Sequence, residues 1–348
     1  MLNKTLLIPI ILAILLLSGC GQSTQSKVLT SPYKETEFLM GTVVTVRIYD
    51  DGKEAILDPA FKRIKSLADQ ITVNEQGSEI DDINKNAGIK AVSVSEDIYK
   101  LIEAGKKYSE KANGSFDISI GPLTSLWHIG FPDARKPDKD EIETTLPLVH
   151  YKDIELNKEE QTVFLKKKGM QLDLGAIAKG FITDEVVKVL NEYEVETAIV
   201  DLGGNIYVIG KNPSGKDWTV GIQDPFSPRG EIVGKISASN ISIVTSGIYE
   251  RFLEVDEIKY HHLLNPQDGY PFNNDVAGVS IISDQSIDGD ALSTVVFSKG
   301  IKDGMEFIEG IKGVEAIFIS TDKKIYTTSG LKNEFELTNN EFRMEELD

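Results

Sequence analysis

The sequence contains one cysteine, Cys20, so the chain forms no internal disulfide and has no multi-cysteine metal site. It also has no P-loop, GxSxG elbow, HExxH or CxxC motif, which mark several common nucleotide-binding, hydrolytic and redox sites. Basic residues are scarce, since 37 Lys and Arg against 55 Asp and Glu give a net charge of -18. Such a surface repels a phosphate backbone, so we expect no nucleic-acid partner. An anionic ligand needs a local cation, such as a metal, to be held here.

The N-terminus carries a targeting pattern. Lys4 precedes an apolar run from Leu6 to Leu17, which is too short to span a bilayer comfortably but matches the core of a signal peptide. The following Ser18-Gly19-Cys20 completes a sequence that resembles a bacterial lipobox, in which the cysteine is lipidated. We therefore expect a signal peptide over residues 1–19 and a lipid anchor at Cys20 on the extracytoplasmic side of the cell membrane. An ordinary secretory signal with a chance cysteine is the alternative, and the pattern fits a single membrane and a periplasm equally.

The rest of the chain predicts one large domain. Residues 20–35 are rich in Ser, Thr and Gln and predict a flexible tether. No long linker interrupts residues 36–338, which predict the folded domain, and residues 339–348 predict a frayed polar tail.

Strand and helix patterns are mixed within the domain. A strand is predicted over Thr42–Tyr49, and Asp58-Pro59 predicts the start of a helix. The apolar positions of this helix share one face: Phe61, Ile64, Leu67, Ala68 and Ile71. Further predictions are a helix after Ser95 with Ile98, Leu101, Ile102 and Tyr108 inward, a helix over 178–193, strands over 198–201 and 205–209 around a Gly-Gly turn, and a helix over 290–299. This mixture, without regular alternation, indicates the α+β class.

The segment Asp173–Gly180 combines an acid, a glycine turn and Lys179 at the predicted start of a helix. Free backbone N–H groups and the helix dipole favour anions at such a position. Asp173 is equally compatible with a simple helix cap, and Lys179 alone with a solvated helix residue.

The segment Asp288–Thr294 places two oxygen-bearing side chains on one helical face, because Asp290 and Thr294 are four residues apart. Carboxylate, hydroxyl and carbonyl oxygens suit a hard cation such as Mg²⁺. Helix capping by Asp288 or Asp290, with a back-bonded Thr294 hydroxyl, explains the same residues without a metal.

The segment His261–Pro271 contains two of the four histidines and the turn signals Asn265-Pro266 and Asp268-Gly269. Adjacent side chains of an extended segment point to opposite faces, so one histidine can enter a site while the other faces solvent. A structural histidine is the alternative to acid–base chemistry. Weaker signals come from Met40-Gly41-Thr42, Ser115–Leu123 and Thr245–Arg251. The segment Asp201–Asn205 is glycine-rich but lacks the GxGxxG spacing.

Taken together and in this order, these segments resemble the ApbE family of FAD:protein FMN transferases from about Phe38 to about Leu337. The resemblance implies a two-lobed α+β fold with FAD in the cleft between the lobes, and transfer of FMN from FAD to a Thr or Ser hydroxyl of an acceptor protein with release of AMP. It implies that the Ala176 carbonyl, Asp290 and Thr294 hold Mg²⁺ and that His262 is catalytic. The positions matching FAD contacts are Met40, Asn74, Ser115, Phe116, Asp117, Asp173 and Lys179.

The sequence departs from the family's pattern at two positions. Asn74 replaces a tyrosine that many members carry, which removes an aromatic stack on the flavin. Ser293 replaces a frequent aspartate near the implied metal.

The loss of the tyrosine at position 74 leaves a FAD pyrophosphatase, which forms free FMN and AMP, as a rival activity. A non-catalytic flavin-binding lipoprotein is a second rival. The expected acceptors are electron-transfer proteins of the same membrane.

Overall fold

The computed structural model describes residues 27–73 and 76–347. The expected signal peptide, the lipidation site Cys20 and the position Asn74 lie outside the described residues.

A nine-stranded sheet forms the centre of the fold, in the order β1-β2-β6-β7-β10-β13-β14-β15-β17. All its strand pairs are antiparallel except β15–β17. The strands are β1 (Val28–Leu39), β2 (Thr42–Asp50), β6 (Ala198–Leu202), β7 (Asn205–Ile209), β10 (Ile241–Gly247), β13 (Val276–Ser283), β14 (Val314–Ser320), β15 (Lys324–Thr327) and β17 (Arg343–Met344).

Three small sheets surround the large one. Their strands are β3 (Val92–Ser93), β5 (Thr162–Leu165) and β4 (Ile154–Asn157), then β16 (Phe335–Leu337), β9 (Ile232–Ala238) and β8 (Trp218–Gln223), and the hairpin β11 (Phe252–Val255) and β12 (Ile258–His261). The hairpin leads directly into His262.

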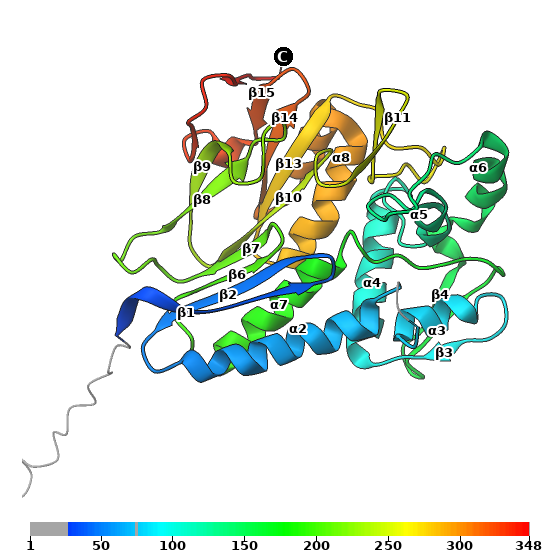
Figure 1. The fold of residues 1–348 in the computed structure, drawn as a ribbon, viewed down its shortest axis with the longest axis horizontal. Coiled ribbons are helices and arrows are strands. Elements are labelled where there is room, and N and C mark those ends of the chain that lie inside the picture. The colour runs from blue at the N-terminus through cyan, green and yellow to red at the C-terminus, as the bar shows by residue number, and fades with distance from the viewer. Residues whose placement is uncertain (1–26, 74–75, 348) are drawn as a thin grey trace, which may run out of the picture.

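The helices gather on one side of the large sheet and at one end of the molecule, to the right in Figure 1. They are α2 (Leu57–Ile71), α3 (Glu79–Lys85), α4 (Glu96–Lys111), α5 (Gly121–Trp127), α6 (Lys139–Thr145), α7 (Ala178–Glu192) and α8 (Ser286–Glu309), with short 3₁₀ turns at Glu54–Ile56, Leu146–Leu148, Tyr151–Asp153 and Ser329–Leu331. Helices and mainly antiparallel strands are segregated, so the predicted α+β class is confirmed.

Local sequence signals explain the first helices. Phe61, Ile64 and Leu67 are buried along one face of α2, as their spacing predicts. Helix α4 begins after Ser95, whose hydroxyl accepts the N–H of Ile98. The predicted start of α2, with Asp58 as the N-cap and Pro59 as the first helical residue, is wrong by two residues. The helix already begins at Leu57, because a 3₁₀ turn over Glu54–Ile56 leads straight into it.

Helix α8 begins four residues before the predicted 290–299, and the predicted end at 299 coincides with a break in the helix at Gly300. It begins at Ser286 because the Asp184 carboxylate on α7 accepts the N–H groups of Ser286 and Ile287. It continues to Glu309 across an interruption at Gly300, where φ is 77°. Asp184 lies 102 residues before Ser286, so this cap is tertiary and leaves no local sequence signal.

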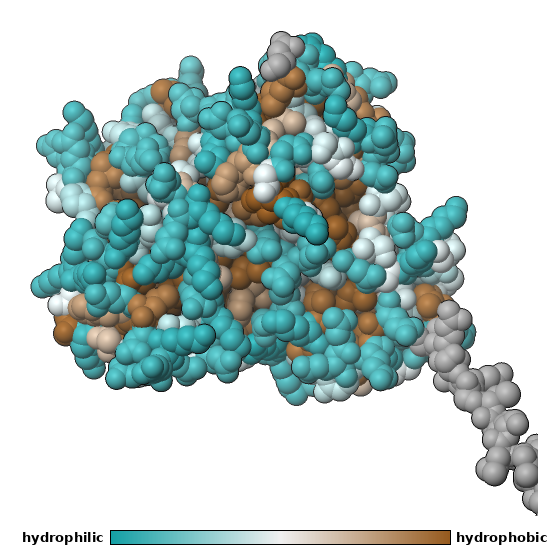
Figure 2. Space-filling model, turned by 180° about the vertical axis from the view of Figure 1, so that it is seen from behind, coloured by the Kyte–Doolittle hydropathy of each residue, from teal (hydrophilic) through white to brown (hydrophobic). Residues whose placement is uncertain are grey.

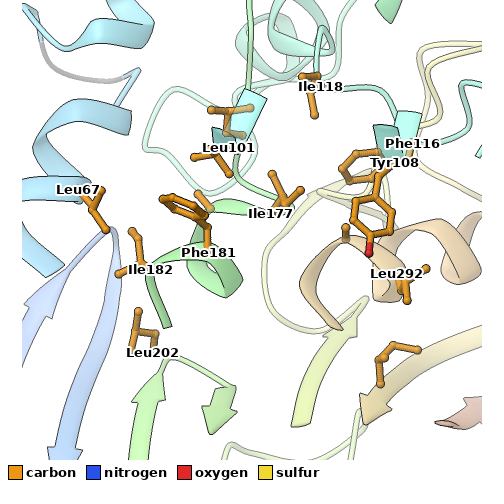
Figure 3. Close-up of a cluster of buried hydrophobic side chains, with 14 of the residues drawn as sticks. Leu67, Leu101, Tyr108, Phe116, Ile118, Ile177, Phe181, Ile182, Leu202 and Leu292 are labelled. Atoms are coloured by element: carbon orange, nitrogen blue, oxygen red, sulfur yellow. The ribbon is translucent and has the colours of Figure 1, made fainter. Parts of the chain in front are cut away.

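The main core lies between the large sheet and the helices. Figure 3 shows Leu101 from α4, Phe181 from α7 and Leu292 from α8 converging there. Close packing of α7 on α8 places the start of one helix against the first turn of the other. That contact determines the geometry of the candidate site.

Two predicted boundaries are wrong. The flexible tether predicted over 20–35 ends earlier, because residues 28–35 belong to β1, which pairs with β2. In this strand the partly buried Tyr33, Glu35 and Glu37 alternate with exposed residues, as is typical of a half-buried strand. The expected polar tail 339–348 returns to the fold: Phe342 is 4% exposed, and β17 pairs with β15.

Figure 2 shows a mostly hydrophilic back face with scattered apolar areas, in keeping with the net charge of -18. Among residues 27–73 and 76–347, no helix combines the length and apolar character needed to cross a membrane.

Candidate functional site

The loop before α7 is held by Asp173. Its Oδ1 accepts the N–H of Gly175 at 2.8 Å, and its own N–H donates to the carbonyl of Ile118 at 2.9 Å. Helix α7 begins five residues later, at Ala178, with Ile177 in the cap position. Asp173 therefore closes the turn that leads to the helix and does not cap the helix itself.

Asp290 on α8 contacts the first turn of α7. It is 3% exposed, and its Oδ2 accepts the N–H of Gly180 at 2.8 Å. In a regular α-helix that N–H would donate to the carbonyl of Ala176. No N–H of the described chain donates to this carbonyl. The contact thus frees a carbonyl oxygen at the place where Asp290 is fixed.

Thr294 lies one turn further along α8 and is partly buried. Its hydroxyl makes no hydrogen bond within the part of the chain that the structure describes, so it is not back-bonded to the helix. Its neighbour Ser293 instead donates to the carbonyl of Asp290 at 2.8 Å and contacts the hydroxyl of Ser246 at 2.8 Å. Neither Asp288 nor Asp290 occupies the N-cap position of α8, which is Gln285. The first N–H groups of the helix donate to the Asp184 carboxylate. The capping explanation of the Asp290–Thr294 pair is therefore wrong.

Lys179 projects from the same turn of α7. Its Nζ donates to Oδ1 of Asn205 at 2.9 Å and lies 3.6 Å from Oδ1 of Asp290. Asn205 is fully buried, and its Nδ2 finds no acceptor among the residues that the structure describes. The Lys179 ammonium thus lies beside Asp290, and the side chain of Asn205, with its unpartnered amide donor, lies against that ammonium. A buried donor without a partner is costly, so this pair suits an anionic ligand.

Sequence reasoning missed Asn205 because it judged the Gly203-Gly204 turn only by dinucleotide-binding spacing. The turn is a β6–β7 hairpin in which both glycines have positive φ, 63° and 100°. The sequence signal for a site residue was the position of Asn205, a polar residue directly after the glycine turn and at the start of an otherwise apolar strand.

His262 follows the β11–β12 hairpin and is partly exposed. Its Nδ1 lies 3.2 Å from the carbonyl oxygen of Arg251, which can only accept. The proton of the neutral ring is therefore on Nδ1, and the lone pair is on Nε2. Surrounding protein atoms desolvate the ring, and the positive charges of Arg251 and Lys179 add to the effect, so the pKa of His262 falls to about 4. The imidazole is neutral and able to accept a proton at ordinary pH.

His261 has a structural role. It is 9% exposed, its Nε2 donates to the carbonyl of Phe272 at 2.8 Å, and its ring meets Phe297 edge to face. Adjacent histidines do take different directions, as predicted. The expectation that the second one faces solvent is wrong, because His261 packs into the core.

Arg251 lies at the edge of the site between two loops. A Cβ added to Gly130 would lie 2.9 Å from its Cδ, and one added to Gly41 would lie 3.2 Å from its Nη2. The guanidinium has no ion-pair partner within residues 27–73 and 76–347. Arg251 therefore brings an unpaired positive charge next to His262 and the β1–β2 turn.

Residues 40–318 match the profile of the ApbE family. The chain belongs to the ApbE family.

Two relatives match most of the chain, and both are named FAD:protein FMN transferase. The protein of Klebsiella pneumoniae is 37% identical over 297 residues, covering 85% of this chain and 92% of its own length. The protein of Treponema pallidum is 33% identical over 347 residues, covering 95% and 96%. The crystal structure of the ApbE protein of Thermotoga maritima superposes with a TM-score of 0.80 at 29% identity, covering 87% of this chain and 98% of that protein.

The positions that the resemblance to the ApbE family matches to FAD contacts lie at several points of the fold. Ser115 is drawn to α8, because Ser298 donates to its hydroxyl at 2.8 Å. Phe116 is 3% exposed and packs edge-on against Tyr108 in the core, as Figure 3 shows. Met40 forms the β1–β2 turn with a positive φ of 52°, next to Gly41 and Arg251.

The Asp117 carboxylate is already engaged. Oδ1 accepts the N–H and hydroxyl of Ser119, and Oδ2 accepts the N–H of Tyr151 at 2.9 Å. Burial raises the pKa of this carboxyl. The side chains of Phe116 and Asp117 are therefore turned into the fold and engaged there in this conformation.

The oxygen donors at the α7–α8 contact fit the Mg²⁺ expected for an ApbE-family site. A carboxylate, a hydroxyl and a carbonyl free of helix bonding are hard oxygen ligands, and Mg²⁺ commonly completes its coordination with water and phosphate. The described residues contain no group of three or more His, Cys, Asp or Glu arranged to hold a metal. A site with one carboxylate therefore depends on the substrate for further ligands.

A separate cavity of about 630 Å³ lies beside α4 and α7. Phe181, Asp184 and Asp288 line it, whereas Lys179, His262 and Asp290 do not. Burial raises the pKa of Asp184 to about 6. This cavity lies next to the cap of α8 and is distinct from the candidate site.

Proposed function

We propose that this chain is a Mg²⁺-dependent FAD:protein FMN transferase that attaches FMN to a Thr or Ser hydroxyl of an acceptor protein and releases AMP. The observation that carries the proposal is the arrangement at the α7–α8 contact. Asp290 is fixed by Gly180 at 2.8 Å, the Ala176 carbonyl is free, and Lys179 lies 3.6 Å from Asp290. Family membership and two relatives bearing this activity's name support it.

The proposed ligands of Mg²⁺ are the Ala176 carbonyl, Asp290 and Thr294. When bound there, the ion would neutralise the pyrophosphate of FAD and stabilise the leaving AMP. Lys179 would donate to a phosphate oxygen, because its ammonium lies 3.6 Å from Asp290. The Nδ2 group of Asn205, which has no acceptor in the described part of the chain, would be a second donor. FAD would extend from there past Ser115 and the Met40 turn.

His262 is proposed as the general base. The acceptor hydroxyl oxygen bonds to the FMN-side phosphorus while the bond from that phosphorus to the bridging oxygen breaks. AMP leaves with the bridging oxygen and its electron pair, and the hydroxyl proton passes to Nε2 of His262. The neutral ring, with Nδ1 donating to Arg251, has the lone pair that this step needs.

The test incubates FAD, Mg²⁺ and the purified chain with a candidate flavin-acceptor domain from the same organism. In-gel flavin fluorescence and intact mass then report on the acceptor. Addition of one FMN, lost with Asp290→Ala or after chelation, supports the transferase. Free FMN and AMP with an unmodified acceptor support the pyrophosphatase. FAD that stays unchanged supports a binding protein.

We also propose that Cys20 carries the lipid anchor and that acceptors lie at the same membrane. Seven residues, 21–27, separate Cys20 from β1. Even fully extended, such a segment spans at most roughly 25 Å, so the domain would stay close to the membrane surface. Radiolabelled fatty acid should enter the wild-type chain, and incorporation into Cys20→Ser would contradict the anchor.

A further inference from the structure

Lys179 has an unusual relation to the carboxylate it faces. Its ammonium hydrogen-bonds to Asn205 at 2.9 Å and remains 3.6 Å from Oδ1 of Asp290, beyond hydrogen-bond distance. The other oxygen of Asp290 is fixed by the N–H of Gly180. The ammonium thus forms an ion pair with Asp290 but gives its hydrogen bond to the neutral side chain of Asn205.

This placement conflicts with a divalent cation at the same carboxylate. Oδ1 of Asp290 makes no hydrogen bond within the described part of the chain, so it is the oxygen open to a metal. A cation bound to it would lie close to the Lys179 ammonium, and Asp290 is only 3% exposed, so water screens their repulsion poorly. Each positive charge therefore opposes the other while no anion is present.

We infer that Lys179 competes with the divalent cation for Asp290 in the free enzyme, and that an anionic pyrophosphate relieves the competition by drawing the ammonium toward itself. The inference rests on the proposed metal and FAD sites. It adds that metal and FAD bind cooperatively through Lys179. The metal then binds weakly until FAD is present, and by linkage each ligand raises the affinity for the other by the same factor.

The test measures Mn²⁺ binding to the purified chain without nucleotide, from the electron paramagnetic resonance signal of free Mn²⁺. Lys179→Met should bind Mn²⁺ about tenfold more tightly than wild type, because the competing charge is gone. Lys179→Arg keeps the charge and should stay weak. Lys302→Met, an exposed position on α8, removes the same charge away from the site and should change the affinity by less than about twofold.

Asn205→Ala gives a change of opposite sign. Without its acceptor, the Lys179 ammonium closes on Asp290, so Mn²⁺ binding should be weaker than in wild type. The double variant Lys179→Met, Asn205→Ala should bind Mn²⁺ as tightly as Lys179→Met alone, since no ammonium remains to compete.

A reciprocal measurement follows FAD binding by flavin fluorescence, with and without Mn²⁺. The gain in FAD affinity caused by Mn²⁺ should be smaller in Lys179→Met than in wild type. Unchanged or weaker Mn²⁺ binding by Lys179→Met would overturn the inference and leave the proposed function intact. Absence of Mn²⁺ binding by wild type, even with FAD, would instead refute the metal site of the proposed function and the inference with it.

Discussion

Gly180 of α7 and Asp290 of α8 are joined by a hydrogen bond of 2.8 Å from a backbone N–H to a carboxylate. The bond joins the first turn of α7, which carries Lys179, to the residue of α8 that lies one turn before Thr294. A side chain at position 180 has no room, because a Cβ there would lie 2.3 Å from the carbonyl oxygen of Ser286 and 2.7 Å from Cβ of Asp290. Glycine at position 180 therefore lets α7 and α8 approach closely enough for this hydrogen bond to form.

Gly180→Ala should force α7 and α8 apart. We expect it to lower the free energy of unfolding by about 1–3 kcal/mol, as overpacking does, and to weaken Mn²⁺ binding. Urea unfolding and Mn²⁺ titration measure the two effects. Gly310→Ala is the matched control, because its nearest contact would be 3.4 Å and its φ is -78°. Equal stability of the two variants would show that the helices do not need this close approach.

Thr294→Val removes a hydroxyl and keeps the shape of the side chain. If the hydroxyl is a metal ligand, Mn²⁺ affinity should fall by roughly tenfold or more. The free energy of unfolding should hardly change, because this hydroxyl makes no hydrogen bond to the rest of the described chain. Thr294→Ser should retain most of the affinity. Wild-type Mn²⁺ binding by Thr294→Val would remove Thr294 from the ligand set.

His262→Ala should leave FAD binding, measured by flavin fluorescence, near the wild-type value. Transfer to the acceptor should fall by about 10²–10⁴-fold, the usual contribution of a positioned base. Transfer at the wild-type rate would exclude the proposed role of His262.

The pH dependence of transfer gives an independent test. A base acts in its neutral form, and desolvation lowers the pKa of His262 to about 4. Its activity is therefore retained as the pH falls through 6 and is lost only near pH 4, so kcat/KM should have its acid limb there. An acid limb near pH 6.5, the ordinary value for histidine, would mean that the ring is solvated in the working enzyme.

Asp184→Ala should loosen the start of α8. The carboxylate accepts two backbone N–H groups, from Ser286 at 2.7 Å and Ile287 at 2.9 Å. Their loss should lower the free energy of unfolding by about 1–3 kcal/mol. Asp303→Ala, at an exposed position of the same helix, should change it by less than about 0.5 kcal/mol. Similar urea midpoints for both variants would contradict the capping role.

The charge of Asp184 adds a pH signature to its stability effect. Burial raises its pKa from 3.8 to about 6 in the folded chain, so the folded state holds this proton more tightly than the unfolded state. The resulting stabilisation is complete below about pH 4 and is lost as the pH rises through 6. The stability advantage of wild type over Asp184→Asn should therefore shrink between pH 4 and 6 in urea titrations. If the stability advantage of wild type instead grew between pH 4 and 6, the pKa of Asp184 would not be raised in the folded state.

The sequence by itself determined the elements whose signals are local. Apolar spacing identified the buried face of α2, Ser95 marked the start of α4, and the Gly203-Gly204 turn separated β6 from β7. Periodicity and capping depend on residues within a few positions of one another, so they can be read along the chain. The order of the polar segments also carried the resemblance that family membership confirms.

Tertiary structure alone decided how those segments meet. Asp290 finds its hydrogen-bond donor 110 residues earlier, at Gly180, and Asp184 caps a helix that begins 102 residues later. Asn205 reaches Lys179 only because β7 lies beside α7. These contacts arise from packing between distant elements, which leaves no periodic or neighbouring signal. They determine that the Ala176 carbonyl is free of helix bonding and that the Lys179 ammonium donates to Asn205. They also determine that His261 is the buried histidine of the adjacent pair.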